Sequence, residues 1–416
     1  MDSNLLSDWL THINSNRPNE GEFGLDRLQS IFSKMIKQSL GKKTIIVAGT
    51  NGKGTTVEYL KNFLLEAGYS TGTYTSPHLI QFNERIQING NHVDDTRIVN
   101  AFKKIEKLKE DTRLTYFDYV TLAAFDIFAS EELDFVIMEI GIGGKHDPVN
   151  LINSDISIIT NIEMDHEKWL GKTREEIGSQ KAAIFKEGKI GILASEQMPE
   201  SVTSLAYKVC SSVLELGKSF KIEENLSGWN YILKENEFDL ENLSYRNLNV
   251  ESAAGAITAF KLISKKEIDY RGVIAKTFLK GRCDVVDNFI FDVSHNPASV
   301  KYLVNFLKKN FEHQNFNAIF SSMSDKDNRS IIKEISDWIS EWNICSIDDD
   351  RFNSSELEAS INDLTGKKVK KFDSVYSAIK NGYHKDDLYV VFGSFLTVSE
   401  GYKAIQEIRG EHSEKN

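Results

Sequence analysis

Short, nearly continuous apolar runs alternate along the chain with longer stretches whose apolar residues recur at helical spacing. The apolar runs predict strands at 44–47, 135–140, 156–160 and 190–194. The helical spacing predicts helices at 5–13, 28–40, 95–109, 117–128, 173–185 and 253–262. Apolar strands separated by helices of this length are typical of an α/β domain with a parallel sheet.

A second alternation of the same kind follows Gly281 and Arg282, which stand near a predicted domain boundary. Its strand and helix patterns lie at 289–293, 298–307, 318–320, 331–339, 342–347 and 389–392. Between the two alternations, the segment 202–248 has a shorter, strand-like pattern with many charges, which predicts a sheet edge or a subdomain. We therefore predict two domains, 1–278 and a smaller α/β domain at 282–416.

The strand at 44–47 leads into a glycine-rich turn, Gly49-Thr50-Asn51-Gly52-Lys53-Gly54-Thr55-Thr56, and then into a helical pattern that ends at Gly68. Such glycines let several backbone N–H groups face one anion, and the start of a helix adds partial positive charge. Lys53 is placed to reach the outer phosphates of a nucleotide, and a threonine hydroxyl to hold magnesium. Because Gly54 separates Lys53 from Thr55, the turn departs from the strict phosphate-loop pattern, and a turn without a ligand is the alternative.

Polar residues follow the ends of the neighbouring predicted strands. Glu139 ends one strand, His166 follows the next, and Lys181 lies on the helix after that. Ser76 lies in a Ser-Pro turn. Ligands of parallel sheets bind beyond the carboxyl ends of the strands, and magnesium prefers oxygen donors together with substrate phosphates. Each of these side chains alone is more often solvated or structural, but their grouping beside a phosphate turn predicts a site.

Composition and charge exclude several classes of protein. The net charge of −11 disfavours a nucleic-acid-binding protein. The N-terminus is polar rather than a signal peptide, and no apolar stretch is long enough for a membrane span, so we expect a cytoplasmic protein without a membrane partner. Cys210, Cys283 and Cys345 lie far apart, which indicates a reducing compartment and favours buried apolar roles over a catalytic thiol.

A second polar cluster, Asp292-Val293-Ser294-His295-Asn296-Pro297, follows the first strand of the C-terminal alternation and opens a helix. Its residue types allow a Ser-His-Asp triad, but the chain has no G-x-S-x-G motif, which disfavours a hydrolase. Ser294 and Asn296 also suit the N-cap of the helix.

Ten motifs occur in an order that is highly specific. They are GTNGKGTT (49–56), TSPHL (75–79), FNERI (82–86), MEIGIGG (138–144), MDHEKWLG (164–171), QKAAIFK (180–186), GR (281–282), DVSHNP (292–297), SDKD (324–327) and FGSF (392–395). Through these motifs nearly the whole chain resembles a folylpolyglutamate synthase, bifunctional with dihydrofolate synthase in many bacteria, within the Mur ligase superfamily of ATP-dependent amide-forming enzymes. The resemblance implies an N-terminal P-loop-type parallel-sheet ATPase domain and a smaller C-terminal Rossmann-like α/β domain.

The resemblance also implies roles for matching residues. Those expected to bind ATP are Thr50, Asn51, Gly52, Lys53, Gly54, Thr55, Arg282, Asp292 and His295. Ser76 and Glu139 would bind one Mg²⁺ and Glu139, His166 and Lys181 a second, with Lys181 carbamylated so that it offers oxygen ligands. Lys53, Lys181, His166 and Glu139 would be catalytic. The pterin-bearing substrate would lie near 23–27 and at Thr115, Tyr116, Phe117, Asp118, His146, Asp147 and Pro148.

The reaction implied by this resemblance joins L-glutamate to the γ-carboxyl of a folate through an acyl phosphate, with ATP converted to ADP and phosphate. The expected partners are folate, L-glutamate and ATP, and the expected state is a monomer. A dihydrofolate synthase, or a bifunctional enzyme acting also on dihydropteroate, is the second hypothesis. A nucleotide-binding switch without ligation is the third, and it leaves Glu139, His166 and Lys181 unexplained.

Three departures from the family's usual sequence bear on substrate preference. An Arg-Leu-Asp-Ala-Thr-Asn segment is here Lys145-His146-Asp147-Pro148-Val149-Asn150. Ser252 stands where an asparagine is usual, and Val293-Ser294 replaces Gly-Ala. The phosphate and metal motifs are unaffected.

Overall fold

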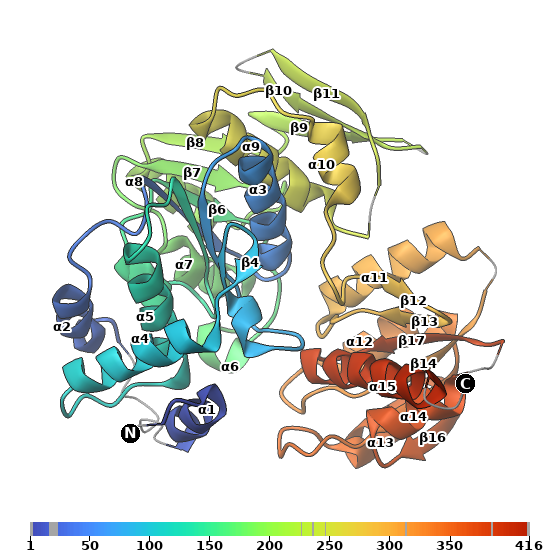
Figure 1. The fold of residues 1–416 in the computed structure, drawn as a ribbon. Helices are drawn as coiled ribbons and strands as arrows, with labels where there is room; N and C mark the ends of the chain where they lie inside the picture. The colour runs from blue at the N-terminus through green and yellow to red at the C-terminus, as the bar shows by residue number, and fades with distance from the viewer. Residues whose placement is uncertain are drawn as a thin grey trace. The chain divides into compact units, whose positions relative to one another are not determined.

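The computed structural model describes residues 3–15, 24–225, 227–234, 237–245, 247–312, 314–383 and 386–413. Its contacts divide the chain into two compact units (Figure 1). The first comprises Met1–Glu163 and Glu167–Thr277, and the second comprises Met164–His166 and Phe278–Asn416.

The first unit is built on an eight-stranded sheet in the order β4-β3-β2-β5-β1-β6-β7-β8. The strands are β1 (Lys43–Ala48), β2 (Thr71–Tyr74), β3 (Ile86–Ile88), β4 (Asn91–His92), β5 (Phe135–Glu139), β6 (Ile156–Ile159), β7 (Ile190–Leu193) and β8 (Ser212–Glu215). From β2 to β8 all neighbours are parallel, whereas β3 and β4 add antiparallel pairs at one edge. The central strands are buried along their length because helices flank the sheet (Figure 1).

Helices connect these strands in the alternation that the sequence predicts. They are α1 (Leu6–Ser15), α2 (Asp26–Met35), α3 (Lys53–Glu66), η1 (Phe82–Arg85), α4 (Asp95–Leu108), α5 (Tyr116–Ala129), η2 (Pro148–Leu151), α6 (Glu167–Leu170), α7 (Arg174–Ala182), α8 (Glu200–Val209), α9 (Val250–Ile263) and α10 (Tyr270–Lys276). The N-caps that end the preceding loops include Asp94, Thr115 and Thr173, each accepting a backbone N–H one turn into its helix.

The segment 202–248 is only partly as predicted. Its start is helical, because Val202 and Ala206 lie four residues apart on one buried face of α8. The remainder gives β8 at the edge of the main sheet and a separate antiparallel sheet in the order β11-β10-β9. These strands are β9 (Phe220–Glu224), β10 (Trp229–Leu233) and β11 (Phe238–Leu243).

The second unit has a six-stranded sheet in the order β12-β13-β17-β14-β15-β16, parallel except for the β12–β13 pair. Its strands are β12 (Asp284–Val286), β13 (Phe289–Phe291), β14 (Phe316–Phe320), β15 (Ile339–Cys345), β16 (Lys368–Phe372) and β17 (Leu388–Phe392). Its helices are α11 (Pro297–Asn310), α12 (Asn328–Ile335), η4 (Ser336–Trp338), α13 (Ser354–Thr365), α14 (Val375–Gly382) and α15 (Phe395–Ser413). The α/β prediction is therefore confirmed for both units, and the pattern predicted at 331–339 is divided among α12, η4 and the first residue of β15.

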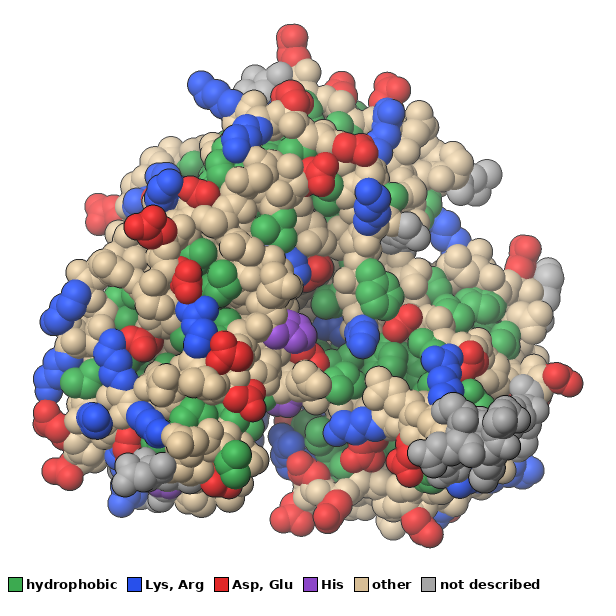
Figure 2. All heavy atoms as spheres, in the orientation of Figure 1, with side chains coloured by type: hydrophobic (Ala, Val, Ile, Leu, Met, Phe, Trp, Pro, Cys, Tyr) green, Lys and Arg blue, Asp and Glu red, His purple; other side chains and the backbone are tan. Residues whose placement is uncertain are grey.

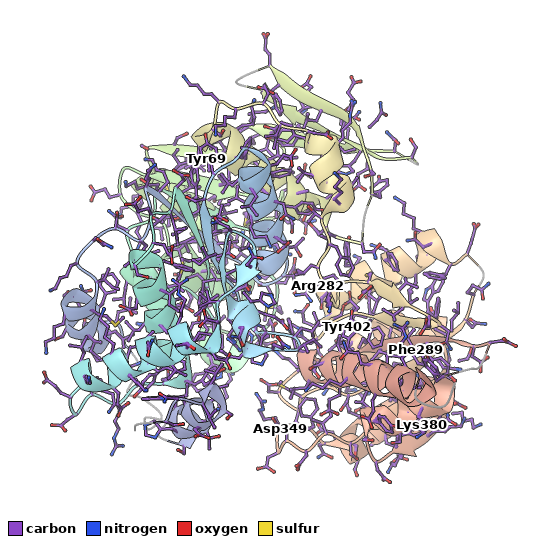
Figure 3. The ribbon with its side chains drawn as sticks, viewed as in Figure 1. Tyr69, Arg282, Phe289, Asp349, Lys380 and Tyr402 are labelled. Carbon is purple, nitrogen blue, oxygen red and sulfur yellow. The ribbon has the colours of Figure 1, made fainter. Side chains whose placement is uncertain are left out.

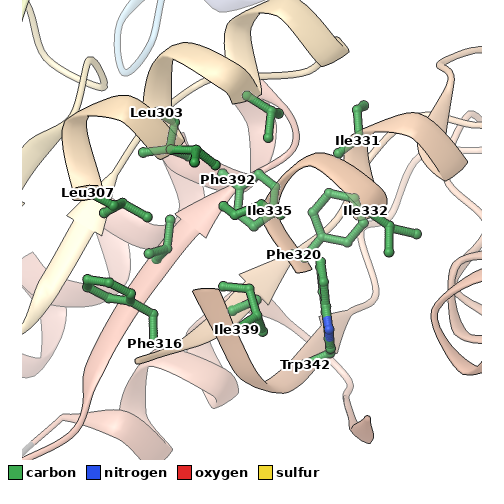
Figure 4. Close-up of a cluster of buried hydrophobic side chains, with 14 of the residues drawn as sticks. Leu303, Leu307, Phe316, Phe320, Ile331, Ile332, Ile335, Ile339, Trp342 and Phe392 are labelled. Atoms are coloured by element: carbon green, nitrogen blue, oxygen red, sulfur yellow. The ribbon is translucent and has the colours of Figure 1, made fainter. Parts of the chain in front are cut away.

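A core of its own supports this second unit. Figure 4 shows its apolar side chains, among them Leu303 and Leu307 from α11 and Trp342 from β15, packed between the sheet and its helices. The rings of Phe320 and Phe392 lie 4.8 Å apart on neighbouring strands. A sheet with its own core needs no metal or disulfide to hold it together.

The molecular surface carries acidic and basic side chains interspersed over the face shown in Figure 2. The three cysteines, all within the described residues, form no disulfide, and burial raises the pKa of Cys210 to about 11 and of Cys345 to about 12. These thiols are therefore poor nucleophiles. Among the described residues, no helix is both long and apolar enough to cross a bilayer.

Candidate active site

The predicted phosphate turn lies at the carboxyl edge of the main sheet, between the ends of three parallel strands. β1 pairs with β5 on one side and with β6 on the other. Val47 of β1 is in register with Glu139 of β5, so the turn after β1 and the Glu139 carboxylate emerge at the same edge. This is the edge at which open parallel sheets bind ligands.

Residues after β6 hold the turn in shape. The Asn161 carbonyl accepts from Thr50 N at 2.9 Å, and its side-chain oxygen accepts from Asn51 N at 2.9 Å. The Thr160 hydroxyl donates to the Asn51 carbonyl at 2.6 Å. The Thr50 hydroxyl accepts from Glu163 N at 3.0 Å. No role is predicted from the sequence for Thr160 or Asn161, although Thr160 ends the strand predicted at 156–160 and Asn161 follows it, beside the turn.

The N–H groups of the following helix remain available for an anion. Gly52 is the N-cap of α3 with φ +83°, and no side chain caps the helix there. No acidic residue lies in the first turn of α3. Because the first N–H groups of a helix have no intrahelical acceptor, this end of α3 presents donors and partial positive charge together.

Two lysines converge on the turn. Lys53 Nζ donates to the carbonyls of Gly49 and Thr50, each at 3.2 Å. Lys181 Nζ, buried on α7, donates to the Gly49 carbonyl at 2.8 Å. The structure thus brings Lys53 and Lys181 to the same turn from different helices.

Replacement of Gly49 by alanine is expected to destabilise the first unit by about 2–4 kcal/mol. Gly49 has φ +144°, and an added Cβ would lie 1.8 Å from the Thr160 hydroxyl oxygen. Gly188→Ala is the control, since Gly188 has φ +69° with open space around it and so reports backbone strain alone. Chemical denaturation of the two variants checks the difference, and equal losses would show that the contact with Thr160 has no cost.

Glu139 and Ser76 form the part of the predicted metal site that the first unit brings together. The Glu139 side chain is 4 % exposed, and its carboxylate accepts from Ser76 N at 3.0 Å. A Cβ at Gly54 would stand 3.6 Å from the same carboxylate, so Glu139 faces the start of α3. Among the described residues no three His, Cys, Asp or Glu side chains form a metal cage. An oxygen-ligated ion that relies on one carboxylate, water and phosphates fits this arrangement.

His166 belongs by its contacts to the second unit, as part of Met164–His166, so its predicted role beside Glu139 stays a prediction. There the Asp165 carboxylate accepts from Lys326 Nζ at 2.6 Å and Asn296 Nδ2 at 3.1 Å. Burial by itself would raise the pKa of Asp165, but the hydrogen bond and charge of His295, with the charges of His166 and Lys326, lower it well below its usual range. Asp165 is therefore ionised and fixes the segment Met164–His166 to Asn296 and Lys326 of the second unit.

The predicted acceptor-binding residues occupy the start of α5 and the turn after β5. The Thr115 hydroxyl accepts from Asp118 N, and the Asp118 carboxylate accepts from Thr115 N and pairs with Arg27 Nη2 at 2.5 Å. Asp118 thus has a structural task at the N-terminus of α5. Phe117 packs on Gly141, where an added Cβ would meet its ring at 2.4 Å. Of the predicted segment 23–27, Phe23 lies outside the described residues.

The other predicted acceptor-binding residues, His146, Asp147 and Pro148, lie in a tight turn after β5. The buried carboxylate of Asp147 accepts from the backbone N–H groups of Gly141, Ile142 and Val149 at 2.9–3.1 Å. Burial raises its pKa to about 7, although these donors favour the charged form. Pro148 is buried in η2, whereas His146 is exposed beside it. Asp147 therefore shapes the glycine turn, and a ligand contact of the exposed His146 stays a prediction.

The C-terminal residues expected to bind nucleotide lie together in the second unit. The Arg282 guanidinium (Figure 3) lies over the Phe395 ring, 5.2 Å from its centre. The ring of His295 lies 6.1 Å from the same ring. Asp292 accepts from the backbone N–H groups of Cys283 and Ser294, at 2.8 and 2.9 Å, and so fixes both flanking turns.

The hydrolase alternative is not supported by this geometry. The Ser294 hydroxyl donates to the Asp292 carboxylate, and His295 Nδ1 contacts the Val293 carbonyl at 2.8 Å. In a Ser-His-Asp triad the histidine bridges the serine and the carboxylate. Here the serine bonds the carboxylate directly, and Asn296 caps α11, as the N-cap interpretation predicted.

Ser252, which stands where the family usually has asparagine, braces the phosphate turn from α9. Its hydroxyl donates to the Gly52 carbonyl at 3.3 Å, and an added Cβ on Gly52 would lie 2.6 Å from the hydroxyl oxygen.

Glu251, the residue before Ser252, has a perturbed carboxyl group. Burial, with the charges of Glu196, Glu224 and Glu163, raises the pKa of Glu251 to about 7.

Because the pKa of Glu251 is higher in the folded than in the unfolded chain, its contribution to stability is full below about pH 4.5 and is lost as the pH rises through about 7. Glu251→Gln is therefore expected to stabilise the protein at pH 8 by about 1–2 kcal/mol and to have little effect at pH 4.5. Thermal unfolding across this range, with the exposed Glu241→Gln as control, measures the effect. A gain independent of pH would contradict the assignment.

Comparison with known proteins places this geometry in a family. The Mur ligase middle domain matches residues 47–260, and the Mur ligase glutamate ligase domain matches residues 281–395. The dihydrofolate synthase/folylpolyglutamate synthase of Escherichia coli (strain K12) is 31 % identical over 421 residues, covering 97 % of this chain and 96 % of the relative.

Solved structures agree with this match. A structure of E. coli FolC in complex with DHPP and ADP has a TM-score of 0.91 at 30 % identity, covering 97 % of this chain and 98 % of that one. A bifunctional folylpolyglutamate synthase/dihydrofolate synthase with Mn, AMPPNP and L-glutamate bound has a TM-score of 0.87 at 31 % identity, covering 96 % and 98 %. These matches confirm the resemblance seen in the motifs. The chain belongs to the dihydrofolate synthase/folylpolyglutamate synthase family of Mur ligases.

Proposed function

We propose that this chain joins L-glutamate to the γ-carboxyl group of the terminal glutamate of a folate. As a member of its family it is an ATP-dependent ligase that forms an amide. The γ-phosphorus of ATP is attacked by a carboxylate oxygen, its bond to the bridging oxygen breaks, and ADP leaves. The glutamate amine then attacks the acyl carbon of the resulting acyl phosphate, loses a proton, and phosphate departs with the former carboxylate oxygen.

The observation that carries the proposal is the convergence on one turn of the uncapped start of α3, Lys53, and the buried Glu139 carboxylate. Backbone N–H groups and Lys53 bind the phosphates and stabilise the charge on the transferring group. Positioning and electrostatics supply most of the rate in phosphoryl transfer, so this arrangement suits the first step. Thr50, Asn51, Gly52, Gly54 and Thr55 complete the nucleotide-binding turn in this proposal.

Ser76, Glu139, His166 and Lys181 are proposed to hold Mg²⁺, with Lys181 carbamylated. When bound, the metal supplies positive charge to the phosphate oxygens. The contact of Lys181 with the Gly49 carbonyl is compatible with this modification, because a carbamate nitrogen keeps one N–H donor while adding oxygens. The carbamate proposed on the buried Lys181 side chain and the carboxylate of Glu139 supply oxygen donors, which Mg²⁺ prefers.

The two parts of the chain are proposed to divide the substrates. Residues 1–278 take ATP and the folate, with Thr115, Tyr116, Phe117, His146 and Pro148 lining the acceptor site and Asp118 and Asp147 shaping it. Residues 282–416 take glutamate and contribute Arg282, Asp292 and His295 toward ATP. The chain is proposed to act as a monomer in the cytoplasm, and its three free cysteines support the proposed compartment.

A second acceptor, dihydropteroate, is favoured by one observation. The E. coli relative and the structure with Mn, AMPPNP and L-glutamate bound carry the dihydrofolate synthase name, and the E. coli FolC structure holds DHPP with ADP. Incubating the purified chain with ATP, labelled glutamate and either tetrahydrofolate or dihydropteroate tests both acceptors. The proposal expects ADP release that depends on glutamate and on an acceptor. Release independent of both would indicate a nucleotide switch instead.

A further inference from the structure

Arg85 is a buried cation without an acidic partner beside the proposed acceptor site. Its side chain is 7 % exposed, at the end of η1. Among the residues that the structure describes, no carboxylate forms an ion pair with its guanidinium. A buried charge without compensation is costly, so arginine in such a position is normally paired.

The neighbouring acid is committed elsewhere. Both oxygens of Glu84 accept backbone N–H groups, from Leu79, Ile80 and Gln81, at 2.7–2.8 Å. The Arg85 Nε group instead donates to Nδ1 of His78 at 2.8 Å. A histidine nitrogen that accepts carries no proton there, so His78 brings no negative charge through this contact. Within the FNERI motif, the Glu84 carboxylate therefore binds the backbone N–H groups at 79–81, while the Arg85 side chain contacts His78.

Aromatic rings hold the guanidinium in place. Its central carbon lies 5.8 Å from the centre of the Phe82 ring and 5.5 Å from that of Tyr116. The two rings meet edge to face with centres 6.3 Å apart. An arginine fixed by rings and by its Nε presents its remaining N–H groups as a rigid fork that matches a carboxylate.

The position of Arg85 links the two halves of the proposed reaction site. Its carbonyl accepts from Thr75 N at 3.0 Å, next to Ser76, whose N–H reaches Glu139. Its side chain lies against Tyr116, one of the residues proposed to line the acceptor site. Arg85 therefore stands between the phosphate side and the acceptor side.

We propose that Arg85 binds the non-reacting α-carboxylate of the acceptor's terminal glutamate, which makes it a specificity-determining residue. This inference rests on the proposed function. The reacting γ-carboxylate must keep its nucleophilic oxygen, and a full ion pair with arginine would weaken it. Dihydropteroate has only the carboxylate that reacts, so Arg85 discriminates between the two acceptor classes.

The test compares Arg85→Gln with the parent enzyme on tetrahydrofolate, dihydropteroate, and a folate whose terminal α-carboxylate is an amide. The glutamine variant is expected to lose about 10–100-fold in kcat/KM on tetrahydrofolate, mostly through KM, and less than about threefold on dihydropteroate. The parent should lose a similar factor on the amide acceptor, whereas the variant should not distinguish amide from carboxylate. Arg97→Gln, at a half-exposed arginine paired with Glu131, is the matched control.

Arg85→Lys keeps the positive charge, so it tests the inference even if the glutamine variant fails to fold. It should retain part of the preference for the α-carboxylate, because a point charge replaces a two-pronged contact. Equal losses on all three acceptors, in either variant, would overturn the inference while leaving the ligase function standing. Inactivity of the parent chain on both natural acceptors would overturn the proposed function and this inference with it.

Discussion

Replacing Lys53 with alanine is expected to lower kcat for ligation by roughly a thousandfold. The Lys53 ammonium lies on the turn, within hydrogen-bond distance of the Gly49 and Thr50 carbonyls. In the proposed site it acts on the negative charge that develops on the transferring phosphoryl group, and a group that acts on this charge affects kcat more than substrate binding. Steady-state kinetics with ATP and tetrahydrofolate measure the loss.

The control is Lys107→Ala, at an exposed lysine of α4. It should leave kcat unchanged, and both variants should unfold at the temperature of the parent protein. If Lys53→Ala raised only KM for ATP and left kcat intact, Lys53 would be a binding residue without a role in the transfer step.

Replacing Lys181 with alanine is expected to lower ligation by about a hundredfold to a thousandfold. In the proposed site the carbamate of Lys181 supplies oxygen ligands, and alanine removes them. Short carboxylic acids such as acetate or propionate should restore part of the activity, because they can offer carboxylate oxygens in the space left by the side chain. Activity measured over a series of acetate concentrations tests this rescue.

Two further readouts separate a carbamate from an ordinary buried lysine. Activity of the parent enzyme should fall when carbon dioxide is removed from the buffer and return when bicarbonate is added. A lysine that only bonds the Gly49 carbonyl predicts no dependence on bicarbonate and no rescue by acetate.

The fold was largely predictable because its signals are local. A continuous apolar run such as that of β5 indicates a strand buried on both faces of a sheet. Where helices alternate with such runs, they predict the central strands of a parallel sheet. The phosphate turn is likewise contiguous in sequence, so its strand, glycines and helix were recognisable before the structure. The helical start of 202–248 was missed because Val202 and Ala206 make a short helical stripe in a charged segment.

Contacts between distant residues were not predictable in this way. Nothing in the sequence pairs Arg27 with Asp118, so Asp118 was assigned to substrate alone although it also caps α5. The brace from Thr160 and Asn161 to the turn depends on the β1–β6 pairing. The isolation of Arg85 appears only when Glu84 is seen to bind the backbone, since an adjacent Glu-Arg pair in sequence suggests mutual neutralisation.

The central claim is that a carboxylate of the acceptor takes the γ-phosphoryl group of ATP before glutamate attacks. The most direct measurement follows heavy oxygen placed in the γ-carboxyl group of the folate acceptor. After turnover with ATP and glutamate, phosphorus NMR or mass spectrometry of the phosphate formed should show one labelled oxygen per phosphate. Phosphate free of label, formed together with ligated product, would contradict the acyl-phosphate mechanism.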